Sequence, residues 1–187
     1  RTPAALRDLL QDVLDIQLVA ADVVGEFLAA TGAQVSTLAT RDRAGAALVR
    51  AGLLTSYQLT RIAGGTGYGL VLGPYRVLDR TGGGSVGTVF RAEHVTLGRR
   101  AAVKAVAAEP DMDPGLIDRF RTECRRIAAI DHPNVVAVLD AGEAPSPGPG
   151  KPALLYLAME PVDGGDVEQA VYAGGPQPAA RVCEWGR

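Results

Sequence analysis

Three glycines and one lysine form the part of the sequence best suited to chemistry. Gly82, Gly84 and Gly87 have the spacing Gly-x-Gly-x-x-Gly, Val89 follows the last of them, and Lys104 ends a short apolar run. Because glycine has no Cβ, the backbone N–H groups of such a loop can come within hydrogen-bond distance of phosphate oxygens. A lysine nearby would supply the positive charge that a polyphosphate needs. The pattern predicts a phosphate-binding loop.

The same glycine spacing occurs in dinucleotide-binding folds, so the residues that follow it must decide. That fold needs a helix opening at the third glycine and an acidic residue about 20 positions later. Here residues 88–95 alternate with a period near two and are rich in β-branched side chains, which predicts a strand. Residues 96–100 then predict a turn and residues 101–106 a second strand. A strand in place of the helix argues against the dinucleotide fold.

With these elements in place, the sequence resembles the N-terminal lobe of a bacterial, planctomycete-type Ser/Thr protein kinase. The run Ala-Ala-Val-Lys ending at Lys104 is similar to the Val-Ala-Ile-Lys of that family. Lys104 and Lys151 are the only two lysines in a chain that otherwise uses arginine. A lysine retained here fits a site that needs a compact ammonium group.

The resemblance implies an α+β fold: a kinase-like N-lobe with a five-stranded antiparallel sheet and one helix, then a hinge and the first helices of the C-lobe. A small all-α segment precedes it, with helices expected near residues 6–14, 20–30, 42–51 and 55–63. We therefore expect a helical segment over residues 1–68 and a truncated kinase domain over residues 69–187. The segment around Thr55 to Gln58 predicts a capping box. This helical part is interpreted as a packing or linker module, with a regulatory or interaction module as the alternative.

The remaining strands are expected at residues 75–80, 135–140 and 153–159, with a helix over 116–130. On that helix the resemblance places Glu123 as the partner that aims Lys104 at the α- and β-phosphates. A surface pair between Glu123 and an arginine of the same helix is the alternative. The run Asp131 to Asn134 resembles the family's turn after this helix, which makes His132 a structural histidine.

The resemblance also implies ATP as the cofactor and names the residues that would hold it. The flap and the roof over the adenine would comprise Thr81, Gly82, Gly83, Gly84, Ser85, Val86, Gly87, Val89 and Ala102. Thr81 stands where the family usually has leucine or isoleucine, so apolar contact with the adenine is expected to be weaker by ~1 kcal/mol.

The run that begins at Met159 resembles the hinge of the family. It implies Met159 as the gatekeeper behind the adenine, the Glu160 carbonyl as an acceptor and the Val162 N–H as a donor to the ring. Asp166 is placed either to reach the ribose hydroxyls or to cap the helix that follows, and both possibilities stay open.

The family's His-Arg-Asp loop and its Asp-Phe-Gly metal site do not occur in the 187 residues. We therefore expect Mg²⁺ ligands only beyond residue 187, no metal site in the chain itself, and no catalysis by these residues alone. The parent protein would transfer the γ-phosphoryl group of ATP to Ser/Thr hydroxyls of a protein substrate. A pseudokinase or scaffolding module is the alternative, and a third hypothesis makes the helical segment the functional unit.

Composition sets further limits on function. The chain is 47% hydrophobic with a net charge of −2, a pI near 5.7 and a mean hydropathy of +0.10. These values predict a folded core and argue against nucleic acid as a partner. No apolar run approaches the ~18 residues of a membrane span, so no membrane contact and a cytoplasmic location are expected, although a parent chain could be anchored downstream. Cys124 and Cys183 fit no metal spacing and are expected to be reduced, buried thiols.

Overall fold

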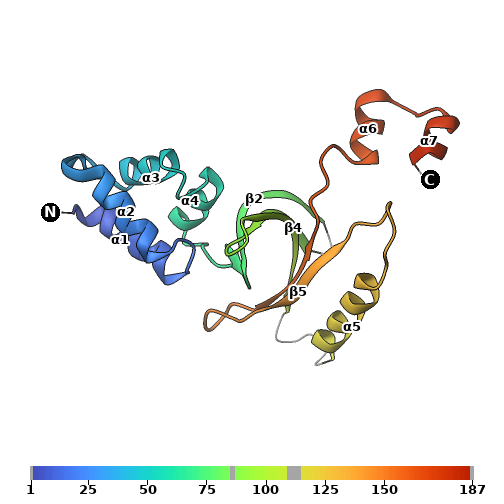
Figure 1. Cartoon of the computed structure of the whole chain (residues 1–187), viewed down its shortest axis with the longest axis horizontal. Helices are drawn as coiled ribbons and strands as arrows, with labels where there is room; N and C mark the ends of the chain where they lie inside the picture. The colour runs from blue at the N-terminus through green and yellow to red at the C-terminus, as the bar shows by residue number, and fades with distance from the viewer. Residues whose placement is uncertain (1, 85–86, 109–114, 186–187) are drawn as a thin grey trace.

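The computed structural model describes residues 2–84, 87–108 and 115–185 of the 187-residue chain. Four α-helices and a short 3₁₀ helix come first (Figure 1). Their bounds are α1 Ala4–Asp15, α2 Ala21–Thr31, η1 Gly32–Thr37, α3 Arg41–Arg50 and α4 Ser56–Ala63. The remaining elements are β1 Val71–Leu72, β2 Tyr75–Gly84, β3 Gly87–His94, β4 Arg99–Ala108, α5 Leu116–Ala128, β5 Val138–Ala144, β6 Ala153–Met159, α6 Val167–Gly174 and α7 Ala179–Trp185.

The N-terminal helices form because each has one apolar face. In α1, Leu6, Leu9, Leu10 and Val13 recur at helical spacing and are all buried. The start of α4 confirms the predicted capping box. The 3₁₀ helix η1 follows α2 directly at Gly32, whose φ of +51° ends the α-helix, and it was not expected from the sequence.

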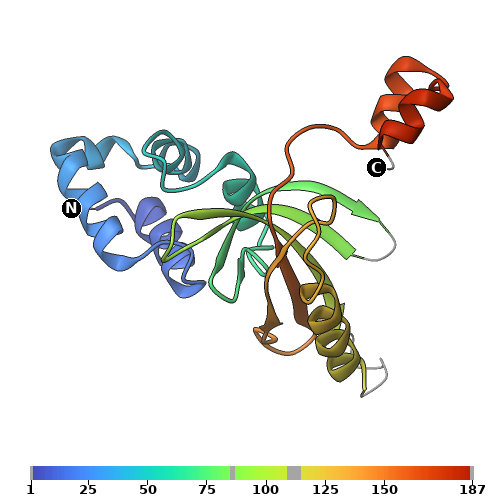
Figure 2. The ribbon, with the colours of Figure 1, turned by 45° about the vertical axis from the view of Figure 1, so that its right-hand side comes forward.

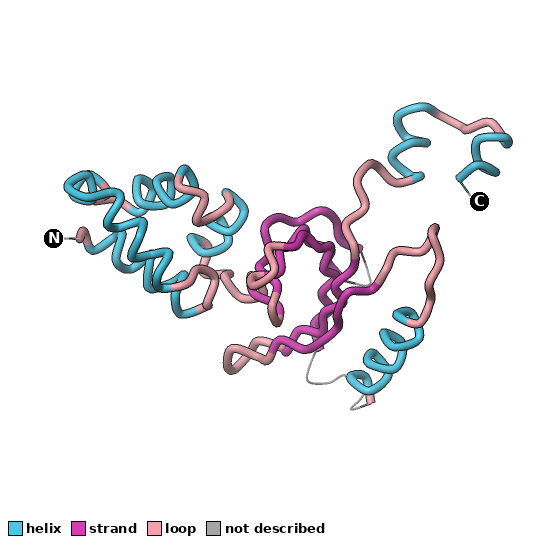
Figure 3. The backbone as a smooth tube through the Cα atoms, viewed as in Figure 1, coloured by secondary structure: helices cyan, strands magenta, loops and turns pink. Residues whose placement is uncertain are grey.

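The sheet is antiparallel throughout and has the strand order β1-β2-β3-β4-β6-β5. Five of its strands were expected, and the two-residue β1 is an addition at the edge. Figure 3 shows the strands curled around a common interior. The chain is therefore α+β, with helices first and an antiparallel sheet after them, as a kinase-like N-lobe requires.

One strand begins later than its sequence suggested. We expected a strand over residues 135–140, but β5 starts at Val138. His132 explains the shift, because its Nδ1 accepts from the Asn134 N–H and its carbonyl accepts from the Val135 N–H. The turn after α5 therefore uses residues that their β-branched side chains would place in a strand. It also confirms a structural role for His132.

The core face of the sheet follows from its register. Phe90 pairs with Val103, and Val103 in turn pairs with Ala158 on β6. These three side chains are at most 8% exposed and belong to one buried cluster that also contains residues of α1–α4. The helical segment and the sheet therefore share a hydrophobic core.

Two views place the helices around the sheet. Helices α1–α4 gather on one side of it, and α5 lies beside β5 on another (Figures 1 and 2). Helices α6 and α7 stand away from the sheet at the end of a long connection. Cys124 of α5 is buried as expected, whereas Cys183 of α7 is exposed, contrary to expectation.

Candidate functional site

The register of the sheet brings four of the predicted site residues to one face. Val89 is the cross-strand partner of Lys104, and Ala102 is the partner of Met159. Since side chains alternate along a strand, Ala102 and Lys104 point to the same side of β4. All four side chains are half-buried, whereas the alternate positions Val103 and Ala158 are fully buried. They form the open face of the sheet, opposite its core face.

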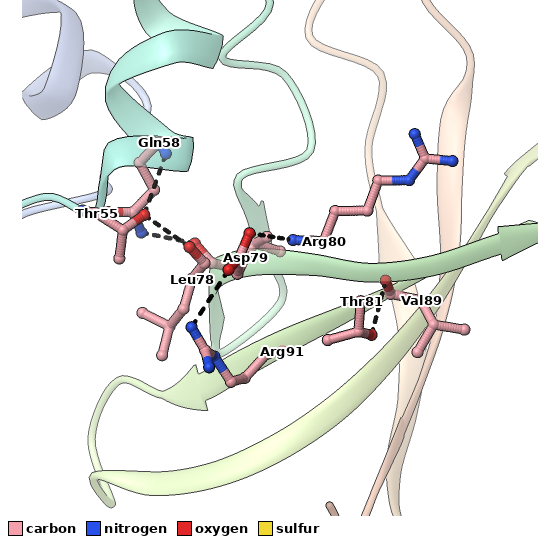
Figure 4. A network of polar contacts seen from close by, with 9 residues as sticks. Thr55, Gln58, Leu78, Asp79, Arg80, Thr81, Val89 and Arg91 are labelled. Atoms are coloured by element: carbon pink, nitrogen blue, oxygen red, sulfur yellow. Dashed lines mark hydrogen bonds and ion pairs between the residues drawn. The ribbon is translucent and has the colours of Figure 1, made fainter. Parts of the chain in front are cut away.

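The predicted glycine loop is the end of the hairpin between β2 and β3. Gly82 pairs with Val89, Gly83 with Thr88 and Gly84 with Gly87. Ser85 and Val86, also predicted to contact nucleotide, lie outside the described residues. The Thr81 hydroxyl donates to the Val89 carbonyl at 3.2 Å, where the register between the two strands shifts (Figure 4). The hairpin therefore ends next to the open face that carries Lys104.

Gly87 is the position in this hairpin where only glycine fits. Its φ is +114°, a conformation that other residues rarely adopt. A Cβ there would also lie 2.6 Å from the carbonyl oxygen of Ala105. A Cβ at Gly82 would meet no atom within 4 Å. Gly87 thus allows β3 to lie close against β4, whereas the space beside Gly82 is open.

The segment after β6 is tied to the residue before β5. The Glu160 N–H donates to the Ala137 carbonyl at 2.9 Å, and the Ala137 N–H donates to Glu160 Oε1 at 3.0 Å. This two-way bridge fixes the backbone directly after Met159, the last residue of the open face. Val162, two residues further on, is 71% exposed. The sequence had predicted a hinge here but gave no sign that the Glu160 side chain helps to hold it.

Comparison with known protein families decides what this arrangement is. The family described as "Protein kinase domain" matches residues 75–183, which is more than half of the chain. The chain belongs to the protein kinase domain family. The matched range begins at the first residue of β2 and includes the glycine hairpin, the open face and α5. Helices α1–α4 lie outside it.

Curated relatives support the bacterial Ser/Thr subgroup of this kinase family. The chain is 40% identical over 111 residues to the serine/threonine-protein kinase PknB of Mycobacterium leprae, which is 59% of this chain and 17% of that protein. It is 37% identical over 114 residues to Pkn1 of Myxococcus xanthus, covering 61% and 15%. It is 42% identical over 92 residues to PknA of Mycobacterium tuberculosis, covering 49% and 21%. The chain thus matches about a fifth or less of the length of these kinases.

In this kinase domain, Glu123 does not pair with Lys104 among the residues that the structure describes. Glu123 lies on α5 with 59% of its side chain exposed, and its Oε1 accepts from Arg126 Nη1 at 2.6 Å. Helix α5 packs on β5 and β6 through the buried Cys124, whose thiol pKa is raised by burial and by the neighbouring Glu123. The surface pair that was the alternative interpretation is the one observed.

Asp166 is observed as a helix cap. Its Oδ1 accepts from the Gln169 N–H at 2.7 Å at the start of α6. Over the described ranges, no cluster of three or more His, Cys, Asp or Glu side chains is placed to hold a metal ion. Nor does any helix in those ranges combine the length and the apolar character that crossing a bilayer requires.

Proposed function

We propose that this chain forms the ATP-binding part of a Ser/Thr protein kinase. The observation that carries the proposal is the pairing of Val89 with Lys104 directly beside the glycine hairpin. Backbone N–H groups in the hairpin can donate to phosphate oxygens, and a lysine on the adjoining strand can neutralise the phosphate charge. The open face is half-buried and largely apolar, which suits a flat base.

The further site residues take the following proposed roles. Thr81, Val89 and Ala102 cover the adenine, and Met159 packs behind it. The Glu160 carbonyl and the Val162 N–H bond the ring, for which the bridge between Glu160 and Ala137 provides a fixed backbone. Ser85 and Val86 complete the flap around Gly82, Gly83, Gly84 and Gly87. Asp166 is proposed to contact the ribose while it caps α6, since a carboxylate has two oxygens and the cap uses one.

We propose that Glu123 exchanges Arg126 for Lys104 when nucleotide is bound. The pair with Arg126 is exposed and spans one helical turn, so its loss costs little, about 0.3 kcal/mol. The interaction free energy of Glu123 with a lysine held in the nucleotide site should be more favourable than that with an exposed arginine. The exchange would fix the direction in which Lys104 points.

We propose that a longer protein containing these 187 residues transfers a phosphoryl group to Ser/Thr hydroxyls of a protein substrate. The 187 residues contain neither the His-Arg-Asp nor the Asp-Phe-Gly tripeptide. Mg²⁺ would supply charge neutralisation at the phosphates, but the described residues offer no donor set for it. The chain by itself is therefore proposed to bind nucleotide without transferring phosphate, with residues 1–68 as a helical segment and 69–187 as the kinase part.

Substitution of Lys104 tests this function. Lys104→Met keeps the length and apolar stem of the side chain and removes its charge, so the affinity for Mg·ATP should fall about tenfold or more. The matched control is Lys151→Met, which removes the other lysine at an exposed position. Titration of both variants with a fluorescent ATP analogue, together with urea unfolding, measures affinity and stability. Equal affinity of Lys104→Met and the unaltered chain would contradict the proposal.

The second candidate function is a nucleotide-binding scaffold without catalysis. The exposed pair of Glu123 with Arg126 favours it, because the lysine is then without its expected carboxylate. A longer chain that includes the residues after Arg187 separates the two candidates. Transfer of labelled γ-phosphate to a generic Ser/Thr protein, lost in Lys104→Met, supports the kinase, whereas ATP binding without transfer supports the scaffold.

A further inference from the structure

The first turn of α4 is bonded to the strand that leads into the glycine hairpin (Figure 4). The Thr55 hydroxyl donates to the Leu78 carbonyl at 2.6 Å, and Gln58 Nε2 donates to the Val77 carbonyl at 2.6 Å. Gln58 is 1% exposed and is, within the described part of the chain, the one polar or charged residue that is fully buried. A buried amide must find partners, and the Gln58 side-chain nitrogen finds one in the Val77 carbonyl of β2.

One of these carbonyls, that of Leu78, lies at a point where β2 is irregular. Val77 pairs with Ala92 and Asp79 pairs with Arg91, so Leu78 is an extra residue in β2 with no partner on β3. Such a bulge interrupts the ladder and leaves backbone groups unpaired unless another donor reaches them. Thr55, at the start of α4, donates to the carbonyl of this extra residue.

The capping box makes the two side chains rigid. Thr55 Oγ1 accepts from the Gln58 N–H at 3.1 Å, and Gln58 Oε1 accepts from the Thr55 N–H at 2.7 Å. The Thr55 hydroxyl accepts from the helix through a lone pair and donates its O–H to β2. Gln58 accepts from the helix through its side-chain oxygen and donates to β2 through its side-chain nitrogen. The capping box therefore orients the two side chains that donate to β2.

The same contact continues into the hairpin. Asp79, next to the bulge, forms an ion pair with Arg91 of β3 at 3.4 Å. The ring of Tyr57 in α4 lies 6.4 Å from that of Phe90, the residue after Val89. Helix α4 therefore contacts both strands of the hairpin, before Gly82 on β2 and directly after Val89 on β3.

We propose that Thr55 and Gln58 are positioning residues for the glycine hairpin, through which the N-terminal helices set its orientation and its affinity for nucleotide. The proposal rests on the proposed function and deepens it, because it gives a regulatory role at the same site to a segment outside the matched residues 75–183. Helix α4 is itself seated on α3, where a Cβ on Gly45 would lie 2.7 Å from Leu59. A displacement of the helical segment would therefore move the glycine hairpin through the hydrogen bonds that Thr55 and Gln58 donate to β2.

Substitutions at Thr55 test the link without removing the helix cap. Thr55→Asp keeps a strong N-cap acceptor but cannot donate to the Leu78 carbonyl, whereas the control Thr55→Ser keeps both functions. Amide hydrogen exchange and Mg·ATP titration are measured on the full 187-residue chain. For Thr55→Asp we expect about tenfold faster exchange over residues 79–84 and 87–91 and about five- to tenfold weaker nucleotide binding, with unchanged exchange in β5 and β6. Thr55→Ser should match the unaltered chain.

Gln58→Met provides a second test if Thr55→Asp fails to fold, because it removes the donor to Val77 without adding charge. Unchanged exchange in the hairpin, or faster exchange spread evenly over the whole chain, would overturn the positioning role. If the unaltered chain binds no nucleotide, the proposed function fails, and the exchange measurement alone still decides whether α4 positions the hairpin.

Discussion

Lys104 and Gly87 owe their positions to neighbouring strands rather than to their own side chains. Lys104 points to the open face because β4 alternates and Val103 is buried on the other side. The positive φ and the missing Cβ of Gly87 allow β3 to lie close to the backbone of Ala105 on β4. The positions of the site residues therefore depend on the strand register. A substitution that shifts the register should also displace these residues.

Gly87→Ala should lower the free energy of unfolding by about 1–3 kcal/mol, because a Cβ there is strained by φ and meets a backbone oxygen. The control is Gly82→Ala, where the Cβ has free space and the effect on stability should be small. Urea unfolding of the two variants checks this. Equal stability of the two variants would show that the hairpin closes differently.

Tyr156 gives a prediction about pH. Burial raises the pKa of its hydroxyl from 10.0 to about 12, and the Asp140 carboxylate, which accepts from it at 3.2 Å, adds to the effect. The folded state therefore favours the protonated hydroxyl, and its contribution to stability is complete below pH 10 and is lost as the pH rises from 10 to 12. The free energy of unfolding should fall more steeply over that range for the unaltered chain than for Tyr156→Phe. Parallel pH profiles of the two proteins would contradict this.

Among the elements, α5 was well predicted in extent but not in its ion pairing. Helical spacing predicted its apolar face, with Glu123 beside it. Four arginines on the same helix compete for that carboxylate, and only the structure shows which one pairs. The start of β5 was missed for a similar reason, since the bonds to His132 that extend the turn depend on side-chain geometry. Strand β3 was predictable because residues 88–95 alternate with a period near two.

Glu123→Ala should change the free energy of unfolding by less than about 0.5 kcal/mol, because the side chain is exposed and its ion pair lies on the helix surface. Cys124→Ser, one residue away, should cost about 1–3 kcal/mol, because it buries a hydroxyl in place of a thiol. Chemical unfolding of both variants measures the contrast. A large loss of stability in Glu123→Ala would mean that this carboxylate is structural.

At the scale of the whole molecule, the helical segment and the sheet are a single packed unit. From the sequence we predicted a boundary after residue 68, together with the helices and the capping box that precede it. It could not show that Gln58 is buried against β2, because a glutamine in a capping box is usually explained by the helix alone. That contact became visible only when two segments about twenty residues apart were brought together.

Removal of residues 1–68 should therefore destabilise the kinase part. Leu70, Leu72 and Val77 are fully buried and belong to the cluster that the helices complete, so the shortened chain would expose them. We expect aggregation or a broad, non-cooperative thermal transition, measured by size-exclusion chromatography and near-UV circular dichroism. A shortened chain that unfolds cooperatively at the original temperature would show that the helices are dispensable for the fold.

We propose above all that the open face and the glycine hairpin together bind ATP. The most direct test of this proposal is a titration of the isotopically labelled chain with Mg·ATP, followed by backbone amide chemical shifts. We predict saturable changes at Gly82–Gly84, Gly87–Val89, Ala102–Lys104 and Met159–Val162, with little change in α1 and α2. Absence of saturable changes, or changes centred on the cavity between α5 and β5 that Arg121, Cys124 and Leu139 line, would contradict it.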